Sequence, residues 1–342
     1  MDDSVLVSLK VHLQSRSLIT VIVETIFMVL INVAALGGNL LVCWAVYKNP
    51  RLRKIPNIYV VSLAISDILM ATMSIPYSCV VLATGRWVFG QTFCQLQGFF
   101  TFFLAFVSLQ TMTATAVNRY FTVVKPNIYR TSKYFTCRFT IYSEILVCVS
   151  ASLGAGLAFG WAEFTLHSGK VFCFPLFYSH KGETGYIAFV DVFYILLSFV
   201  VLSFCYLQIF RVVRAHKKLM VSSKLRNSAR SSHLSVSEIK ITKVLFATVL
   251  AFTICWTPIV LIDLSEAISA PHPINLPRRI YLAYIYLGYG SSSVNPIIYG
   301  IMNSAFRSEF LKFLPCLSNR VHPRISGPQS SVAVYNATGI SA

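Results

Sequence analysis

Residues 18–47 read LITVIVETIFMVLINVAALGGNLLVCWAVY, an apolar stretch long enough to cross a lipid bilayer as one helix. A helix rises about 1.5 Å per residue, so this stretch exceeds the roughly 30 Å of hydrocarbon in a typical membrane. Six further stretches of this kind follow, at 56–83, 92–124, 139–164, 186–213, 239–267 and 280–302. The sequence therefore predicts an all-α membrane protein, with a bundle of seven transmembrane helices over residues 18–302.

The composition of the 342-residue chain agrees with a membrane protein. Hydrophobic residues make up 56% of it and charged residues 12%, whereas a typical soluble domain is about 25% charged. This is more apolar side chain than a soluble interior of that size can bury, so lipid must cover part of the surface. The composition excludes an ordinary cytosolic enzyme, and the sequence contains no HExxH or GxSxG motif.

Basic residues are concentrated on one side of the predicted topology. The connectors after the first, third, fifth and seventh stretches hold 21 Lys and Arg, and the opposite side holds seven. Because the cytoplasmic segments of membrane proteins carry the excess of Lys and Arg, we expect residues 1–17 outside the cell and the C-terminus in the cytoplasm, as in a multi-pass plasma-membrane protein. The net charge of +17 therefore reflects topology, and binding to nucleic acid is not expected.

The segment after the seventh stretch divides into two parts. Residues 303–314 place Phe306 and Phe310 on one side and charged residues on the other, which predicts a short amphipathic helix on the inner membrane surface. Residues 315–342 are rich in Ser, Pro and Gly, which predicts a disordered cytoplasmic tail. Cys316, at the start of this tail, is a candidate for lipidation.

Two of the nine cysteines fall outside the cell in the predicted topology. Cys94 begins the third span, and Cys173 lies in the loop before the fifth. The extracellular side is the oxidising compartment, where disulfides form and persist. We predict a Cys94–Cys173 disulfide that holds this loop over the mouth of the bundle.

Polar residues within the spans point to function, because an ionisable group in a membrane is costly. Asp67 lies in the middle of the second span. In a single bundle, oxygen atoms of Ser108, Ser292 and Asn295 would converge near it, together with Asn39, in a cavity suited to water or a hard monovalent cation. The alternative is a satisfied polar network that only specifies packing.

The inner end of the third span carries Asn118, Arg119 and Tyr120. Arg119 needs an acceptor there, and Glu238 begins the sixth span. A contact between them would tie the two spans together, and its loss would open a cytoplasmic cleft. The alternative is that Arg119 extends to the lipid headgroups and Glu238 is an acid favoured at a helix N-terminus.

Two spans contain prolines that remove a backbone hydrogen bond. Pro258 lies in the sixth span within CWTP, where Trp256 precedes it, and Pro296 lies in the seventh. Prolines kink helices, and kinked helices are natural hinges. The sixth and seventh spans are therefore predicted to bend.

Together these motifs resemble the rhodopsin-like family of G-protein-coupled receptors, over roughly residues 31–314. The resemblance rests on five motifs in order along the chain: Asn39, LAISD at 63–67, NRY at 118–120, CWTP at 255–258 and NPIIY at 295–299. It implies an agonist pocket in the outer half of the bundle and outward movement of the sixth span. The implied partners are a heterotrimeric G protein, arrestin, receptor kinases, an extracellular small-molecule agonist and membrane lipids.

The resemblance also assigns roles to individual residues. It implies a sodium ion held by Asp67, Ser108, Ser292 and Asn295. The residues implied in coupling and activation are Asn118, Arg119, Tyr120, Tyr206, Glu238, Trp256, Pro258, Asn295, Pro296 and Tyr299. Tyr206 and Tyr299 resemble the tyrosines that swing inward and hold the opened arrangement.

The chain departs from the family pattern at three places. Asn118 replaces the usual acid beside Arg119, which predicts elevated basal activity. The fourth span has Glu144 and Ile145 where a tryptophan is usual, and the fifth has Ser198 near the usual proline. No role for Glu144 follows from the sequence.

Comparison within the family narrows the ligand. Thr101 lies where receptors for protonated amines carry Asp, so a biogenic amine is not expected. Tyr289 lies where opsins carry the retinal-binding Lys, so no covalent retinal is expected. The overall resemblance is greatest to melatonin receptors, which implies coupling to the inhibitory class of G protein. Ala158 and Phe177 replace the Asn and Gln with which those receptors hold their ligand.

The predicted pocket consists of Thr101, Ala105, Tyr194, Trp256, Ile259, Tyr286 and Tyr289. These side chains carry no fixed charge, which favours a small neutral or amphipathic ligand. Asp191 and Asp263 lie near the outer ends of their spans and leave open a cationic ligand. The sequence is also compatible with an opsin-derived receptor, with a peptide or lipid receptor of the same family, and with a transporter.

Overall fold

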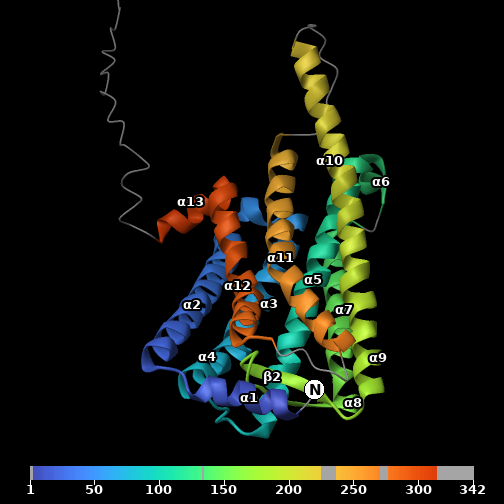
Figure 1. Cartoon of the computed structure of the whole chain (residues 1–342). Coiled ribbons are helices and arrows are strands. Elements are labelled where there is room, and N and C mark those ends of the chain that lie inside the picture. The colour runs from blue at the N-terminus through green and yellow to red at the C-terminus, as the bar shows by residue number, and fades with distance from the viewer. Residues whose placement is uncertain (1–2, 133–134, 225–235, 270–275, 314–342) are drawn as a thin grey trace, which may run out of the picture.

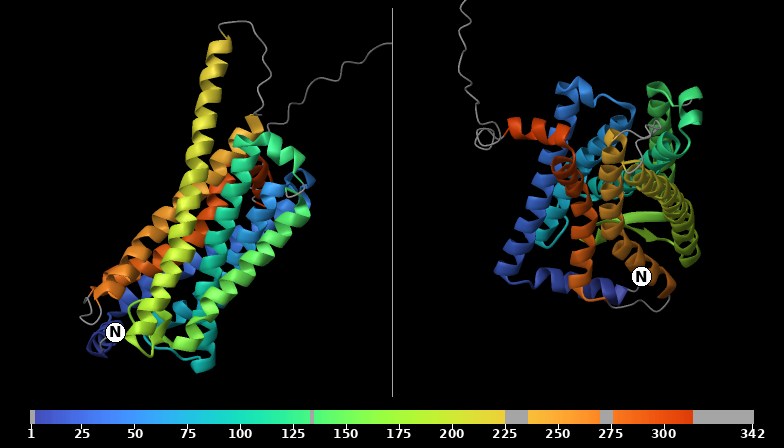
Figure 2. Two further views of the ribbon diagram at one scale, coloured as in Figure 1. Left: turned by 90° about the vertical axis from the view of Figure 1, so that its right-hand side faces the viewer. Right: turned by 90° about the horizontal axis from the view of Figure 1, so that it is seen from above.

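The computed structural model describes residues 3–132, 135–224, 236–269 and 276–313, and most of them are helical (Figure 1). Seven helical rods lie side by side as a transmembrane bundle, and three of them are subdivided by breaks or changes in helix type (Figure 2). They are α2 (Leu18–Lys48), α3 (Ile55–Met73) with α4 (Ile75–Thr84), α5 (Gln91–Val124), α7 (Cys137–Gly156) with α8 (Ala158–Trp161), α9 (His180–Val190) with the π-helical η2 (Asp191–Leu196) and α10 (Leu197–Lys224), α11 (Val236–Ser269), and α12 (Arg278–Met302).

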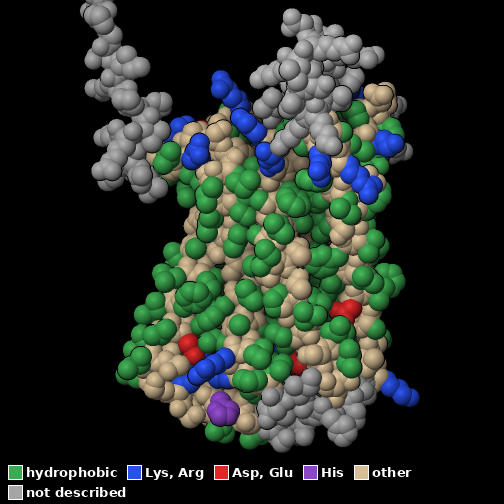
Figure 3. Space-filling model, turned by 45° about the horizontal axis from the view of Figure 1, so that its top comes forward, with side chains coloured by type: hydrophobic (Ala, Val, Ile, Leu, Met, Phe, Trp, Pro, Cys, Tyr) green, Lys and Arg blue, Asp and Glu red, His purple; other side chains and the backbone are tan. Residues whose placement is uncertain are grey.

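Six of these rods are long and apolar enough to cross a membrane by length and composition. The seventh, α12, has 25 residues but is more polar. Its polar residues face inward, because Ser291, Ser292 and Asn295 are all buried in the bundle. Apolar side chains cover the sides of the molecule between its two ends, as Figure 3 shows for one face. The seventh span is thus less apolar because it presents its polar side chains to the other helices.

A β-hairpin follows the fourth rod, where the sequence predicted a longer span. The fourth rod, α7 with α8, ends at Trp161, so the predicted stretch 139–164 ends three residues too late. Strand β1 (Ala162–His167) pairs antiparallel with β2 (Phe172–Phe177). The apolar residues that extended the predicted span are buried in this hairpin, and Phe164 is fully enclosed.

The two ends of the bundle differ in structure and charge. The hairpin end carries β1, β2 and the N-terminal helix α1 (Asp3–Gln14), which was not predicted (Figure 1). α1 is anchored there because Leu9 packs on Tyr281 and Leu13 joins the main hydrophobic core. The opposite end, called the α13 end below, carries many of the blue Lys and Arg side chains in Figure 3.

The α13 end is built from short elements around the ends of the rods. These are η1 (Pro50–Leu52), α6 (Pro126–Thr131) and α13 (Ser304–Lys312), which occupies most of the predicted amphipathic segment. Asn303 caps α13 by accepting a hydrogen bond from the Ala305 N–H. Phe306 is buried and stacks on Tyr299 with ring centroids 5.6 Å apart. This contact fixes α13 against the end of α12.

Candidate functional site

A cavity of about 130 Å³ lies inside the bundle near the hairpin end. It is bounded by α3, α5, β2, α9, η2, α11 and α12, and most of its wall is apolar, with nine aromatic side chains. Five of the seven predicted pocket residues line it: Thr101, Ala105, Trp256, Ile259 and Tyr289. Apolar walls with a few placed polar groups are typical of small-molecule sites.

The remaining two predicted pocket residues lie elsewhere. Tyr194 stacks on Phe106 with centroids 4.4 Å apart and donates to the Ser150 carbonyl at 2.7 Å, toward α7. It lies in the π-helical η2, whose wider turn orients side chains differently from a regular α-helix. Tyr286 donates to the Glu24 carbonyl of α2 at 2.9 Å. Neither residue lines the cavity in the structure, and a role for them in ligand binding stays a prediction.

Hydroxyl groups form a network at one side of the cavity. The Tyr289 hydroxyl is hydrogen-bonded to Ser74 at 2.9 Å and to Ser78 at 3.1 Å, and Ser74 also contacts the Thr101 hydroxyl. Ser74 lies at the break between α3 and α4. The Gln97 amide donates to the Ser74 carbonyl and the Ser78 hydroxyl, both at 3.2 Å. This side of the cavity is polar but uncharged.

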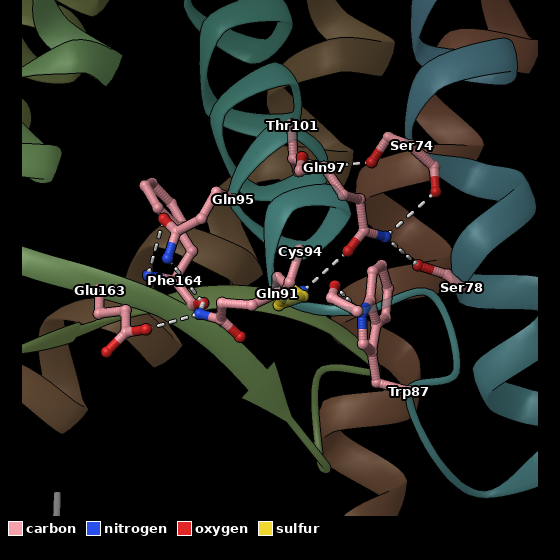
Figure 4. The surroundings of a disulfide bond; sticks show 12 residues. Ser74, Ser78, Trp87, Gln91, Cys94, Gln95, Gln97, Thr101, Glu163 and Phe164 are labelled. Atoms are coloured by element: carbon pink, nitrogen blue, oxygen red, sulfur yellow. Dashed lines mark hydrogen bonds between the residues drawn. A yellow bond between two sulfur atoms is a disulfide. The ribbon is translucent and has the colours of Figure 1, made fainter.

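The hairpin is tied to α5 by a covalent and a polar contact (Figure 4). Cys94 and Cys173 form the predicted disulfide. The Cys173 N–H also donates to Gln97 Oε1 at 2.9 Å. Gly98 allows the close approach, because a Cβ there would lie 2.2 Å from the ring of Phe164. These contacts hold β2 against the cavity.

A buried ion cluster closes the outer side of the cavity. Lys170, between β1 and β2, is fully buried, and its Nζ lies 2.8 Å from both Asp263 Oδ1 and Glu266 Oε2. Tyr284 donates to Asp263 Oδ2 at 2.9 Å, and Tyr281 donates to Glu266 Oε1. Burial opposes ionisation of the ammonium, but the two carboxylates hold the pKa of Lys170 above its ordinary value. The cluster joins the hairpin to the ends of α11 and α12.

The cavity is more acidic than the sequence predicted. Glu183, Asp191, Asp263 and Glu266 all line it, and Lys170 neutralises part of this charge. Asp191, on η2, is half-buried and has no cationic partner in the described part of the chain. The Asp191 carboxylate is therefore available to a hydrogen-bond donor on a ligand.

His167 makes the hairpin sensitive to acid. It is buried, its Nδ1 accepts the Lys170 backbone N–H at 3.0 Å, and its Nε2 has no partner among the described residues. Burial, and then the nearby Lys170 charge, hold the pKa of His167 well below its ordinary value of about 6.5. Below pH 6.5 the unfolded hairpin thus binds a proton that the folded one does not, so stability falls as the pH is lowered.

We expect amide hydrogen exchange in residues 162–177 to increase when the pH is lowered from 7.5 to 5.5, after correction for intrinsic exchange. The loss of stability approaches about 1.4 kcal/mol per pH unit below 6.5. His167→Gln keeps an acceptor but cannot titrate, so its exchange should respond much less. An equal response in both proteins would assign the acid sensitivity to other groups.

The residues predicted to hold sodium lie on α3, α5 and α12. Asp67 is buried, and its Oδ2 accepts from the Asn295 amide at 2.9 Å. Ser292 is buried on α12 near Asp67. Ser108 approaches from α5 and is hydrogen-bonded to Ser66, beside Asp67, at 3.1 Å. The structure thus brings the four predicted residues into one buried polar region.

Among the predicted coupling residues, Asn118, Arg119, Tyr120 and Tyr206 lie toward the α13 end. Among the described residues, Arg119 is the largest fully buried side chain. Tyr206 is buried within electrostatic range of Arg119, and Tyr120 packs on Phe204 with centroids 5.7 Å apart. Asn118 is also buried, but its Oδ1 has no partner in the described part of the chain. The environment of Arg119 thus includes residues of α5 and α10.

Two predicted residues lie where the structure gives no side-chain contacts. Glu238 is in the first turn of α11, but its side chain is outside the described part of the structure. The Arg119–Glu238 contact therefore stays a prediction. Cys316 lies beyond residue 313, also outside the described residues.

The predicted hinge residues connect the cavity with the rest of the bundle. Pro258 lies inside α11 and Pro296 inside α12. Trp256 lines the cavity, stacks on Phe252 with centroids 5.4 Å apart and donates from Nε1 to the Ser291 hydroxyl at 3.2 Å. A change in the cavity at Trp256 thus reaches both proline-containing helices.

Comparison with known proteins is decisive on the family. The sequence profile described as "7 transmembrane receptor (rhodopsin family)" matches residues 38–299. The chain belongs to the rhodopsin family of seven-transmembrane receptors. This is a family of G-protein-coupled signalling receptors, not an enzyme family.

Similar proteins include melatonin receptors and opsins. The chain is 31% identical to melatonin receptor type 1B of Mus musculus over 291 residues, covering 82% of this chain and 75% of that protein. It is 29% identical to melanopsin-B of Xenopus laevis over 300 residues, covering 85% of this chain and 54% of that protein. The crystal structure of squid rhodopsin superposes with a TM-score of 0.71 at 21% identity, covering 88% of this chain and 87% of that one. The structural similarity shows the shared fold.

Proposed function

We propose that this receptor binds a small amphipathic ligand in the aromatic cavity and thereby activates heterotrimeric G proteins. The observation that carries the proposal is the cavity itself, whose largely apolar wall includes Asp191, a carboxylate without a cationic partner among the described residues. A ligand with a flat apolar body and one hydrogen-bond donor fits this chemistry. The similarity to melatonin receptors makes indoleamines the first ligands, and the inhibitory G-protein class the first pathway, to test.

We propose that the hairpin end faces the outside of the cell and the α13 end faces the cytoplasm of a plasma-membrane receptor. The basic residues at the α13 end support this orientation, and so does the disulfide at the hairpin end. Arrestin and receptor kinases would then meet the same end as the G protein.

G-protein dissociation in cells tests the proposed function. Wild type and Asp191→Asn are compared across the G-protein classes, with indoleamines, neutral lipids and retinoids as ligands. An active amphipathic ligand should lose about tenfold in potency in Asp191→Asn, since one hydrogen bond to a charged group is weakened. If the wild type, at verified surface expression, activates no G protein with any of these ligands, the result would count against the proposed function. Ligand-dependent solute flux would instead favour a transporter.

We also propose that Asp67 binds a sodium ion. The fit is supported by Asn39, whose amide donates to the Ser292 carbonyl at 2.9 Å while its own Oδ1 is buried without a partner among the described residues. One carboxylate surrounded by hydroxyl and amide oxygens suits a hard monovalent cation. Asp67 and Asn295 would hold the ion, with Ser108 and Ser292 beside them.

Sodium is expected to lower agonist affinity in the wild type and to have little effect in Asp67→Asn. The substitution keeps the size of the side chain but removes the charge that attracts the ion. Binding is measured in sodium chloride and in choline chloride at equal ionic strength. Equal sodium dependence in both proteins would show that the ion acts elsewhere.

Glu238→Ala is expected to raise basal G-protein activation at equal surface expression. If Glu238 restrains Arg119, removal of its carboxylate frees the end of α11 to move outward. Glu238→Gln, which keeps the length of the side chain, should raise basal activity less. Unchanged basal activity in Glu238→Ala would contradict the restraint.

A further inference from the structure

The side-chain hydrogen-bond donors in the described wall of the cavity near the hairpin end are already used within the protein. Five of the lining side chains carry an N–H or O–H group, and none of these is a lysine, arginine or histidine: Thr101, Tyr186, Trp256, Tyr284 and Tyr289. The bonds described above use the donors of Trp256 and Tyr284. The Tyr186 hydroxyl donates to the Gly154 carbonyl at 3.3 Å. These three donors are therefore not available to a ligand.

The protons of Thr101 and Tyr289 can be followed through the hydroxyl network. Thr101 donates its one hydroxyl proton to the Gln97 carbonyl at 2.7 Å. In its contact with Ser74, Thr101 must therefore accept, and Ser74 is the donor. Ser74 then has no proton left for Tyr289, so the Tyr289 hydroxyl is the donor in the bond between them. On this side of the cavity a ligand meets only hydrogen-bond acceptors.

The cavity wall carries more carboxylates than cations. Four carboxylates line it, and the Lys170 ammonium contacts two of them, Asp263 and Glu266. Asp191 lies within electrostatic range of Asp263, so the two negative charges repel each other. A partly buried carboxylate without a counter-charge is costly in a medium of low dielectric constant. A cation beside Asp191 would reduce this cost.

The backbone gives Asp191 an unusual position in the fifth rod. The π-helical η2 begins at Asp191, and at its end the Leu197 N–H donates to the Val192 carbonyl, a step of five residues. Single π-helical turns within α-helices are frequent at functional sites. Thr101, on α5, supplies no charge to the cavity. The fifth rod thus provides the carboxylate that α5 lacks at this position.

We propose that the ligand is a protonated arylalkylamine, whose ammonium pairs with Asp191 and whose ring lies among the aromatic side chains of the cavity. This inference names the ligand class of the site in the proposed function and rests on that function for its location. The ammonium supplies both the donors and the positive charge that the wall lacks, and neighbouring aromatic rings stabilise a cation further. A carboxylic acid or a phosphate would meet acceptors and like charge, so the cavity should reject anions.

The size of the cavity sets the size of the probe. An apolar cavity of about 150 Å³ holds one benzene molecule, so a single ring suits a cavity of about 130 Å³. Phenethylamine, phenethyl alcohol and phenylacetate are matched probes, because they carry a cationic, a neutral and an anionic group on the same ring. They differ mainly in charge and in their hydrogen-bond donors.

Thermal unfolding of the purified full chain in lipid nanodiscs measures binding of the three probes. A ligand that binds only the folded protein raises the unfolding temperature as its concentration increases. We expect phenethylamine to bind about tenfold more tightly than phenethyl alcohol, because hydrogen bonds between charged groups are stronger than those to a neutral donor. Phenylacetate should give no stabilisation. Equal binding of the three probes, or no stabilisation by the amine, would overturn the proposal.

Three variants locate the charge and the cavity. Asp191→Asn should bring the affinities of the amine and the alcohol to within about threefold of each other. Glu163→Gln removes an exposed carboxylate of β1 that does not line the cavity, and it should keep the tenfold preference. Ala105→Leu fills part of the cavity and should weaken the amine and the alcohol alike. If Asp191→Asn fails to fold, the three probes on the wild type and on Ala105→Leu still decide the question.

This inference and the proposed function can fail separately, because thermal unfolding needs no G protein. An amine preference that is lost in Asp191→Asn, in a receptor that activates no G protein, would retain this inference and count against the proposed function. A receptor that is activated by a neutral ligand and binds the amine and the alcohol equally would do the reverse. An amine preference that survives in Asp191→Asn would show that another group binds the ammonium and would overturn the assignment to Asp191.

Discussion

Arg119→Ala is expected to abolish ligand-stimulated G-protein activation while ligand affinity changes by less than about threefold. A fully buried arginine in a membrane protein is costly, and such groups are retained at functional positions. The cavity residue Ala105 and Arg119 are 14 positions apart on α5, or about 21 Å along the helix. Removing the guanidinium should therefore affect coupling much more than binding.

Two further variants test whether the guanidinium itself is needed. Arg119→Lys keeps the charge but lacks the planar group with five donors, so intermediate activation is expected. Arg138→Ala removes an exposed arginine in the first turn of α7 and should leave activation near the wild-type level. Activation is measured by G-protein dissociation at matched surface expression. A fully active Arg119→Ala variant would show that coupling does not depend on Arg119.

The sequence was sufficient to predict the bundle because each span is set by its own length and apolar content. It was insufficient at the end of the fourth span, where Phe164 extends the apolar run but belongs to a strand. Hydrophobicity shows that a residue is buried, but not whether lipid or protein covers it. The hairpin is defined by pairing between strands, and the single apolar run did not reveal this pairing.

Residues of the site could be predicted where they lie about one helical turn from a motif that the sequence reveals. Ile259 is three positions after Trp256, and both line the cavity. Tyr194 does not line the cavity, because it lies in a π-helical turn that orients its side chain toward α7. The ion cluster around Lys170 was not predicted, because its partner Asp263 is 93 residues away along the chain. No local sequence pattern relates the two residues. A lone lysine close to Cys173 in the disulfide-linked loop was the only sequence signal for this cluster.

Lys170→Met is expected to lower the thermal unfolding temperature by about 6 °C. Methionine keeps much of the side-chain volume but leaves Asp263 and Glu266 facing each other without the ammonium. Removing one member of a buried ion pair costs about 3–5 kcal/mol. We expect a cost at the lower end of this range, because the side chains of Asp263 and Glu266 are 28% and 19% exposed and water screens their charges. A loss of about 3 kcal/mol in the free energy of unfolding corresponds to the expected fall of about 6 °C in the unfolding temperature of a protein of this size.

The matched control is Lys181→Met, which removes an exposed lysine in α9 and should change the unfolding temperature by less than about 1 °C. Combining Lys170→Met with Asp263→Asn and Glu266→Gln should recover part of the loss, because the repulsion between the carboxylates is then removed. A single variant as stable as the wild type would show that the cluster does not hold the hairpin in place.

The Lys170→Met variant also distinguishes a cationic ligand from a neutral one. Asp263 and Glu266 line the cavity, and the Lys170 ammonium is paired with both carboxylates. A cationic ligand must therefore compete with the ammonium for these carboxylates, and its affinity should rise in Lys170→Met if the hairpin stays in place. A neutral ligand has no such competition and should gain nothing. Since Lys170 is held both by the carboxylates and by the ring of Phe174, 3.7 Å from its Nζ, we expect the proposed ligand to leave this cluster intact and to donate to Asp191 instead.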